Sequence, residues 1–140
     1  MPIRCGIVSQ DRVVYTDDVD IVVLPGAGGV MGVLPNHSPV LTTLQFGIIT
    51  VRKKGEEQFF TVAGGVAEVQ PDQVTVLADA AENVEEIDTQ RAEAARKRAE
   101  ELLQKGVGPD TDQYLAIQAA LRRSNLRLDA AQRLRRSRRS

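Results

Sequence analysis

The chain has 140 residues with 18 Lys or Arg and 19 Asp or Glu, and its formal net charge of −1 excludes a uniformly charged binder of polyelectrolytes. Apolar residues make up 42% and charged residues 26% of the chain, values typical of an ordinary soluble domain. No apolar run approaches the roughly 18–20 residues that a membrane-spanning helix needs, and the only cysteine, Cys5, excludes an intrachain disulfide.

The charge is unevenly distributed along the chain. Residues 1–80 carry five basic and nine acidic side chains, and residues 81–112 have the same numbers. Residues 113–140 carry eight arginines and one acidic residue, Asp129. This asymmetry indicates that the basic end meets an acidic or anionic partner.

Residues 1–84 have the pattern of a β domain. Short β-branched runs alternate with turn residues, and no helical pattern separates them. We expect strands at residues 3–7, 12–15, 19–24, 40–44, 47–51, 58–62, 66–69 and 74–77. This spacing predicts an antiparallel sandwich or barrel, because parallel strands need long crossover connections. Cys5 falls on the apolar face of the first strand and is expected to be a small buried residue.

Residues 85–140 have a helical pattern. Asp88 is a good N-cap for a helix with an alanine-rich apolar side, Gly106 ends that helix, and Asp110 or Asp112 begins a second one. The apolar positions of the second helix include Leu115, Ala119, Leu126 and Ala130. The short connection predicts an antiparallel helical hairpin. Since alanine buries little apolar area, we expect the hairpin to be weakly held and able to detach from the β domain.

The residues that carry chemistry do not predict an enzyme. His37 is the only histidine and lies on a loop between two prolines, where a bond to the backbone or a contact with a partner is expected. The glycine cluster at residues 26–32 lacks the third glycine and the following helix of a dinucleotide loop, and no phosphate-loop lysine follows it. We therefore expect turn glycines, no catalytic residue and no bound metal.

One group of charged side chains has a spacing that suits a polyanion. Asp88, Arg91 and Arg98 fall close to one face of the first helix, and Arg123 and Arg127 share a face of the second. In an antiparallel hairpin the arginines of both helices can converge on phosphate oxygens. From spacing alone, ordinary solvated charge is the more frequent explanation.

Three sequence phrases follow one another in the β domain: GVLPNHSPV at residues 32–40, VAGGVAEV at residues 62–69 and VTVLAD at residues 74–79. Together with the helical hairpin, they resemble the epsilon subunit of F-type ATP synthases over nearly the whole chain. The resemblance implies a ten-stranded antiparallel β-sandwich over residues 1–84 and a regulatory two-helix hairpin over residues 85–140.

The resemblance also implies a non-catalytic rotor subunit that couples proton flow to ATP synthesis. The sandwich would contact the gamma subunit and the c-ring, peripherally on the cytoplasmic side of the cell inner membrane. Family members bring the loop matching residues 29–39 against the c-ring, which implies contacts by Gly29, Asn36 and His37. The hairpin would fold against the sandwich or extend along gamma into the alpha/beta catalytic head, where it inhibits ATP hydrolysis.

Some bacterial members of that family bind ATP in the folded state through the motif Ile/Leu-Asp-x-x-Arg-Ala. This chain has IDTQRA at residues 87–92. The resemblance therefore implies ATP as a regulatory ligand, with no cofactor required. The site would contain Glu82, Ile87, Asp88, Arg91, Ala92, Arg98, Arg123 and Arg127. ATP would bridge the two helices and favour the folded hairpin to the extent that it binds that state more tightly.

Two other functions fit parts of the sequence. The arginine-rich end suits nucleic-acid phosphates, but it has no aromatic residues interleaved for stacking on bases, and the β domain is acidic. We therefore expect no nucleic-acid partner. The second alternative is a free-standing ATP sensor that does not belong to a larger assembly.

Overall fold

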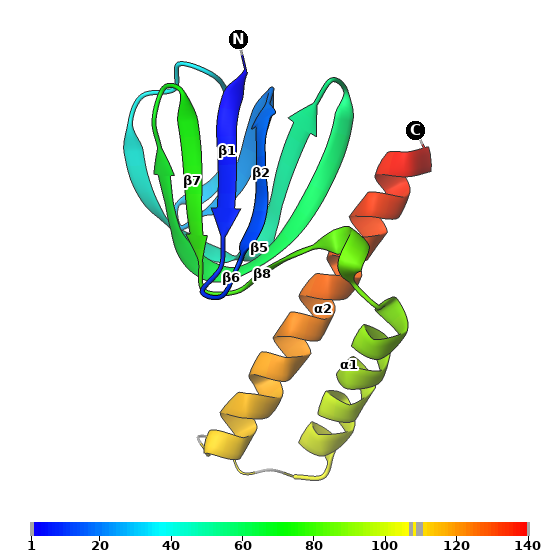
Figure 1. Ribbon diagram of the computed structural model, residues 1–140. Coiled ribbons are helices and arrows are strands. Elements are labelled where there is room, and N and C mark those ends of the chain that lie inside the picture. The colour runs from blue at the N-terminus through cyan, green and yellow to red at the C-terminus, as the bar shows by residue number, and fades with distance from the viewer. Residues whose placement is uncertain (1, 107, 109–110, 140) are drawn as a thin grey trace.

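The computed structural model describes residues 2–106, 108 and 111–139. Within them, eight strands precede a short 3-10 turn and two helices (Figure 1). The strands are β1 (Ile3–Val8), β2 (Val13–Val19), β3 (Ile21–Gly26), β4 (Gly29–Val33), β5 (Val40–Lys53), β6 (Glu56–Val69), β7 (Gln73–Ala78) and β8 (Ala81–Asn83). The 3-10 turn is η1 (Val84–Glu86), and the helices are α1 (Thr89–Gln104) and α2 (Asp112–Arg139). The predicted class, a mainly β domain followed by a helical hairpin, is confirmed.

The strands form one folded sheet in the order β2-β1-β7-β6-β5-β3-β4, and β8 pairs with β6. All neighbouring pairs are antiparallel except β1 and β7, which run parallel with Cys5 opposite Val74. A parallel pair requires a long crossover, and here the five strands between β1 and β7 in the chain supply it. This pair departs from the purely antiparallel arrangement that the sequence predicts.

The number of strands also differs from the ten that the resemblance implies. Four of the expected strands join in pairs to form β5 and β6, each of 14 residues. The β5–β6 ladder keeps one register but is interrupted at Gln45 and Gly64, which do not pair. The buried side of β5 changes between Leu44 and Ile49. Gly64 and Gly65 have φ values of 89° and 128°, which favour glycine. These residues bend the long strands without ending them.

The glycine cluster forms a β-hairpin, because residues 27–28 connect β3 to β4 in a tight turn. Gly29 begins β4 with a φ of 129°, a backbone angle that residues other than glycine rarely adopt. The prediction of turn glycines is therefore confirmed, and the structure adds β4, a strand that the glycine-rich sequence does not predict.

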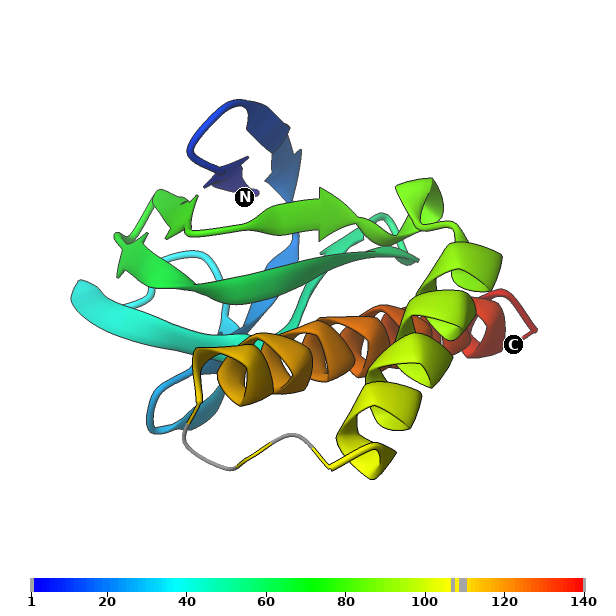
Figure 2. The same ribbon diagram turned by 90° about the horizontal axis from the view of Figure 1, so that it is seen from below.

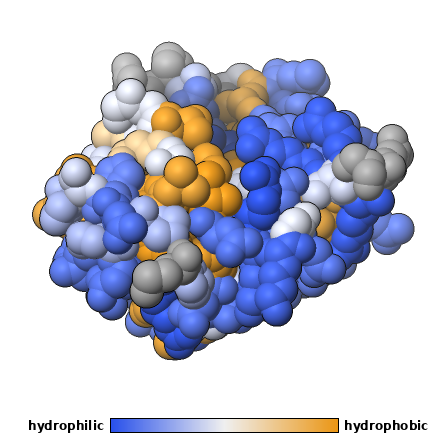
Figure 3. All heavy atoms as spheres, turned by 90° about the horizontal axis from the view of Figure 1, so that it is seen from above, coloured by the Kyte–Doolittle hydropathy of each residue, from blue (hydrophilic) through white to orange (hydrophobic). Residues whose placement is uncertain are grey.

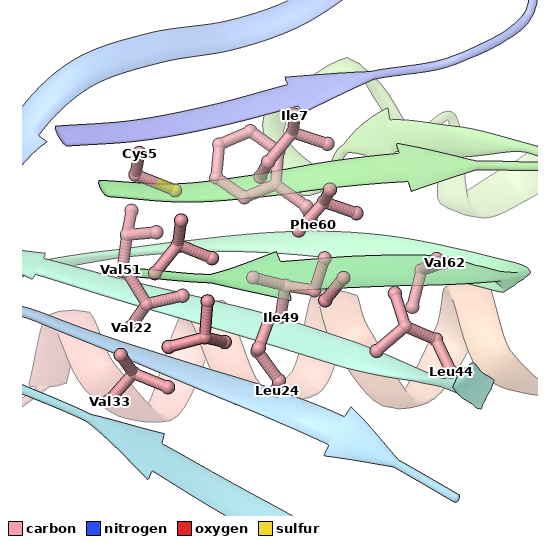
Figure 4. Packing of buried hydrophobic residues seen from close by; sticks show 14 of the residues in the cluster. Cys5, Ile7, Val22, Leu24, Val33, Leu44, Ile49, Val51, Phe60 and Val62 are labelled. Carbon is pink, nitrogen blue, oxygen red and sulfur yellow. The ribbon is translucent and has the colours of Figure 1, made fainter. Parts of the chain in front are cut away.

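The core lies between the two layers of the folded sheet (Figure 4). Alternate residues of each strand enter it, as strand geometry requires. Those that Figure 4 labels are Cys5, Ile7, Val22, Leu24, Val33, Leu44, Ile49, Val51, Phe60 and Val62, all buried. Cys5 is fully buried as predicted, and this burial raises the pKa of its thiol to about 12.

The hairpin is folded against the sandwich. Helix α2 lies along β5 and β6, and α1 packs beside α2 (Figures 1 and 2). A small second cluster joins helix and sheet: Phe59, Val84, Ala130 and Ala131 are buried, and Ile48, Ile87 and Leu134 pack against them. Because two of its four buried members are alanines, this cluster holds the hairpin with little apolar area.

The helix ends follow the expected capping rules with one difference. The Asp88 carboxylate accepts a hydrogen bond from the backbone N–H of Arg91 at 3.1 Å, so the predicted cap of α1 is confirmed. At the start of α2, the Thr111 hydroxyl accepts from the backbone N–H of Tyr114 at 3.1 Å. Thr111 is therefore the cap, and Asp112 is the first helical residue. The alternative start, Asp110, lies outside the described residues.

One predicted apolar position of α2 does not face the interior. Leu115 is 58% exposed, whereas Ile117, two residues later, is 7% exposed. The four-residue spacing from Ala119 suggests that Leu115 lies on the buried side, but α2 continues past the sheet at its N-terminal end, where that side meets solvent (Figure 1).

Candidate functional site

A cleft with a volume of about 580 Å³ lies where α1, α2 and the segment leaving the sandwich meet. Its wall is formed by Glu82, Glu86, Ile87, Asp88, Arg91, Ala92, Ala94, Ala95, Arg98 and Arg127. Seven of the eight residues assigned to an ATP site from the sequence are in this wall. They come from three separate elements, namely β8, α1 with its cap, and α2.

Helix geometry explains how α1 presents two of its three arginines to the cleft. Arg91 and Arg98 are seven residues apart, which is close to two helical turns, so both side chains leave the same face. Ala92 lies on the buried side of α1 and is 3% exposed. Its small side chain lets the backbone of α1 approach the rest of the molecule closely. Asp88 holds the first turn of α1 in place through its cap.

The third arginine reaches the cleft from α2. Arg127 Nε donates a hydrogen bond to Glu82 Oε1 at 2.6 Å. The same oxygen accepts a hydrogen bond from the Thr61 hydroxyl at 3.4 Å. Thr61 belongs to β6 and Glu82 to β8, so this contact ties α2 to the sandwich at the edge of the cleft.

Arg123, the eighth residue of the predicted set, does not line the main cleft. It lines a smaller adjoining cleft of about 120 Å³, whose wall also contains Glu82 and Arg127. The two clefts therefore share two residues, and Arg123 lies one helical turn before Arg127 on α2.

The charges of the main cleft are unevenly matched. Glu82 pairs with Arg127, and Glu86 pairs with Arg12 of the β1–β2 connection at 3.2 Å. Among the described residues, no acidic side chain forms an ion pair with Arg91 or Arg98. Two guanidinium groups are thus available to an anion in the cleft, and guanidinium groups match phosphate oxygens in geometry.

The residues assigned to a c-ring contact do not form one compact site. Asn36 and His37 lie on the loop after β4, where the Asn36 N–H donates to the Pro71 carbonyl at 2.8 Å and His37 Nδ1 is 2.7 Å from the Ser38 carbonyl. Gly29 lies at the opposite end of β4, a strand that is about 13 Å long. A surface that includes all three must run along the whole edge strand.

Two residues of the site region have no signal in the sequence. Glu86 enters the cleft because η1 turns the chain between β8 and α1. Thr61 meets Glu82 because the β6–β8 register places them directly opposite each other. Only a sheet register would have revealed this pair.

The described residues contain neither a metal-binding cluster nor a membrane-spanning helix. Across residues 2–106, 108 and 111–139, no group of three or more His, Cys, Asp or Glu side chains is arranged to hold a metal ion. In the same residues, no helix is both long and apolar enough to cross a membrane.

Comparison with known proteins identifies the family. The family model described as "ATP synthase, Delta/Epsilon chain, beta-sandwich domain" matches residues 2–84, and the one described as "ATP synthase, Delta/Epsilon chain, long alpha-helix domain" matches residues 85–132. The chain belongs to the ATP synthase epsilon family. The resemblance seen in the sequence is thereby confirmed, and the function at this level is that of an epsilon subunit of the F-type ATP synthase.

Individual relatives agree with this assignment. The ATP synthase epsilon chain of Herpetosiphon aurantiacus is 43% identical over 138 residues, which cover 99% of both chains. That of Bacillus licheniformis is 41% identical over 129 residues, 92% of this chain and 97% of the relative. In fold, the chain is similar to one in the mitochondrial ATP synthase of Euglena gracilis, with a TM-score of 0.66, 24% identity and coverage of 97% of this chain and 81% of that one.

Proposed function

We propose that this epsilon-family chain is a non-catalytic regulatory subunit whose hairpin binds ATP in the folded state. The observation that carries the proposal is the convergence of Arg91, Arg98 and Arg127 on one cleft of about 580 Å³. A volume of this size suits a ligand as large as a nucleotide. Three guanidinium groups from two helices suit its triphosphate.

The composition of the cleft supports a regulatory role for the ligand. Glu82 belongs to the sandwich, Arg91 and Arg98 to α1, and Arg127 to α2, so only the folded arrangement holds all four together. If the hairpin left the sandwich, Glu82 and Arg127 would separate. ATP therefore favours the folded hairpin through its higher affinity for that state.

The sandwich, in this proposal, attaches the subunit to the rotor by contacts with gamma and with the c-ring, at the cytoplasmic face of the inner membrane. The loop that carries Asn36 and His37 is exposed, as are the neighbouring Leu34 and Leu41 at 58% and 68%. Figure 3, which views the end of the sandwich that carries the N-terminus, shows apolar side chains gathered in its middle. Asn36 and His37 are the proposed polar part of the c-ring contact, and Gly29 is proposed to belong to the same contact.

The hairpin, when released, is proposed to inhibit ATP hydrolysis by extending along gamma to the alpha/beta head. Its apolar contact with the sandwich is a small cluster in which two of the four buried residues are alanines. Its polar contacts with the sandwich include the partly exposed Arg127–Glu82 ion pair, the Ser137–Glu57 hydrogen bond and the packing of Arg122 on the Phe46 ring. The eight arginines of residues 113–140 provide the charge for an acidic surface on the head.

The regulatory proposal is tested by ATP hydrolysis in the reconstituted catalytic complex, with the full chain and with a chain that ends at residue 87. We expect faster hydrolysis with the shortened chain, at equal occupancy of the complex. Equal hydrolysis rates would contradict regulation by the hairpin. In a parallel assay, His37→Ala is expected to weaken binding to isolated c-ring while binding to gamma is kept.

A further inference from the structure

We infer that Thr61, a residue of the sandwich, is a positioning residue for the nucleotide site. The inference rests on the proposed ATP binding and adds a residue outside the hairpin to the groups that determine affinity. Thr61 does not line the main cleft; it acts through Glu82 and Arg127.

The position of Thr61 is set by the sheet. It lies on β6 directly opposite Glu82 of β8 in an antiparallel register, and opposite residues in such a pair have Cβ atoms about 4.5–5.5 Å apart. Thr61 is 5% exposed, so water has little access to its hydroxyl. The Glu82 carboxylate, 26% exposed, is therefore the partner that satisfies this buried hydroxyl.

Glu82 in turn restrains Arg127. The Glu82 Oε1 atom accepts from Thr61 Oγ1 at 3.4 Å and from Arg127 Nε at 2.6 Å. Because Nε of the guanidinium group is bound to the carboxylate, the planar group keeps one orientation and its terminal nitrogens stay free to meet an anion. Arg91 and Arg98 line the same cleft and carry the same charge as Arg127. Without Glu82, their electrostatic repulsion would push the Arg127 side chain away from them.

The distances determine how large the effect of Thr61 is. Its hydrogen bond at 3.4 Å is longer than the ordinary 2.5–3.0 Å, whereas the arginine bond at 2.6 Å is short. Thr61 therefore contributes less than either charged residue. We expect the loss of its hydroxyl to weaken ATP binding about three- to fivefold.

The test compares three full-length variants by calorimetric titration with ATP. Thr61→Val removes the hydroxyl at nearly constant volume and is expected to raise the Kd for ATP about three- to fivefold. Thr61→Ser keeps the hydroxyl and is expected to have the Kd of the wild type. The matched control is Thr75→Val on β7, a threonine outside both cleft walls, which leaves Kd unchanged. Equal Kd values for wild type and Thr61→Val would overturn the inference.

A double mutant separates positioning from general stability. If Thr61 acts through Glu82, Thr61→Val has no further effect on Kd in a Glu82→Gln background. A full additional loss in that background would mean that Thr61 supports the fold rather than Arg127, and would also overturn the inference. The proposed function fails differently, because then the wild-type chain itself gives no heat with ATP.

Discussion

At the scale of single residues, the site depends on which arginines lack an acidic partner. Arg127 is held by Glu82, whereas no described acidic side chain pairs with Arg98. An arginine without a partner exchanges only water for phosphate when an anion binds. Its contribution to affinity is therefore larger than that of a side chain that must first break an ion pair.

Arg98→Ala is expected to weaken ATP binding by at least about tenfold, since a charge-assisted hydrogen bond contributes about 1.5–3 kcal/mol. Lys97→Ala is the matched control, because Lys97 neighbours Arg98 but does not line the main cleft. Calorimetry on both variants measures the change in Kd. A similar loss in both would show a general charge effect and contradict a specific role for Arg98.

Burial of Cys5 and Tyr15 makes the fold sensitive to high pH. Burial raises the pKa of the Cys5 thiol to about 12, and burial with the nearby charge of Asp17 raises the pKa of the Tyr15 phenol to about 12. Both groups ionise more easily in the unfolded chain, so the free energy of unfolding falls as pH rises from about 9 towards 12. Urea unfolding at pH 8 and pH 10.5 measures it. In Cys5→Ala the fall should be smaller, and an equal fall would contradict the role of the thiol.

At the scale of elements, β6 contributes neighbouring residues to two hydrophobic clusters, the core of the sandwich and the cluster under α2. Phe60 points into the sandwich and is fully buried, and Phe59 points the other way, under α2. The strand alternates faces as all strands do. One element therefore determines both the stability of the sandwich and the docking of the hairpin.

Phe59→Ala is expected to release the hairpin while the sandwich stays folded. Hydrogen exchange should become faster in α1 and α2 and remain slow in β1, β6 and β7. The control, Phe60→Ala, is expected to destabilise the sandwich by about 3–5 kcal/mol. If Phe59→Ala accelerated exchange equally in strands and helices, the two parts would not be separable as proposed.

The elements also show what sequence reasoning can reach. Capping by Asp88 and the helical hairpin follow from local rules, and so they were predictable. The sequence does not predict β4, because two of its five residues are glycine. It divides β6 because Gly64 and Gly65 resemble the end of a strand. It divides β5 because the buried side changes between Leu44 and Ile49, which interrupts the alternation of apolar residues. The Thr61–Glu82 contact depends on a sheet register between distant residues, which no local pattern contains.

The convergence of the site could be predicted only in part. Helical spacing brings Arg91 and Arg98 to one face, but it does not show which face of α2 meets them. In the structure Arg127 enters the main cleft and Arg123 the adjoining one. This division follows from the way α2 lies on β6, a packing detail beyond periodicity.

At the scale of the whole molecule, the uneven charge of the chain produces ion pairs between α2 and the acidic segment that leaves the sandwich. The acidic segment after β7 pairs with arginines of α2: Glu82 with Arg127, and Glu85 with Arg138. These pairs hold α2 at two points, eleven residues or about 16 Å apart along the helix. The Glu85–Arg138 pair is more than half exposed, so it contributes at most about 1 kcal/mol.

Raising the salt concentration is therefore expected to increase the fraction of chains with a released hairpin. Energy transfer between dyes at Gln10→Cys and Ala116→Cys, both exposed positions, measures that fraction. The buried Cys5 thiol stays unlabelled. Glu85→Gln should release more hairpin at low salt and reduce the salt dependence, whereas Glu56→Gln, in the β5–β6 turn region, should do neither. No dependence on salt would contradict the electrostatic hold.

The central claim is that the folded hairpin is a nucleotide sensor, and titration of the full chain with ATP in a calorimeter tests it most directly. We predict saturable binding of one ATP per chain, with a Kd that rises when Arg91 or Arg127 is replaced by alanine. The titration is done under conditions in which energy transfer shows that the hairpin is folded. If it then gives only heat of dilution, the claim is contradicted.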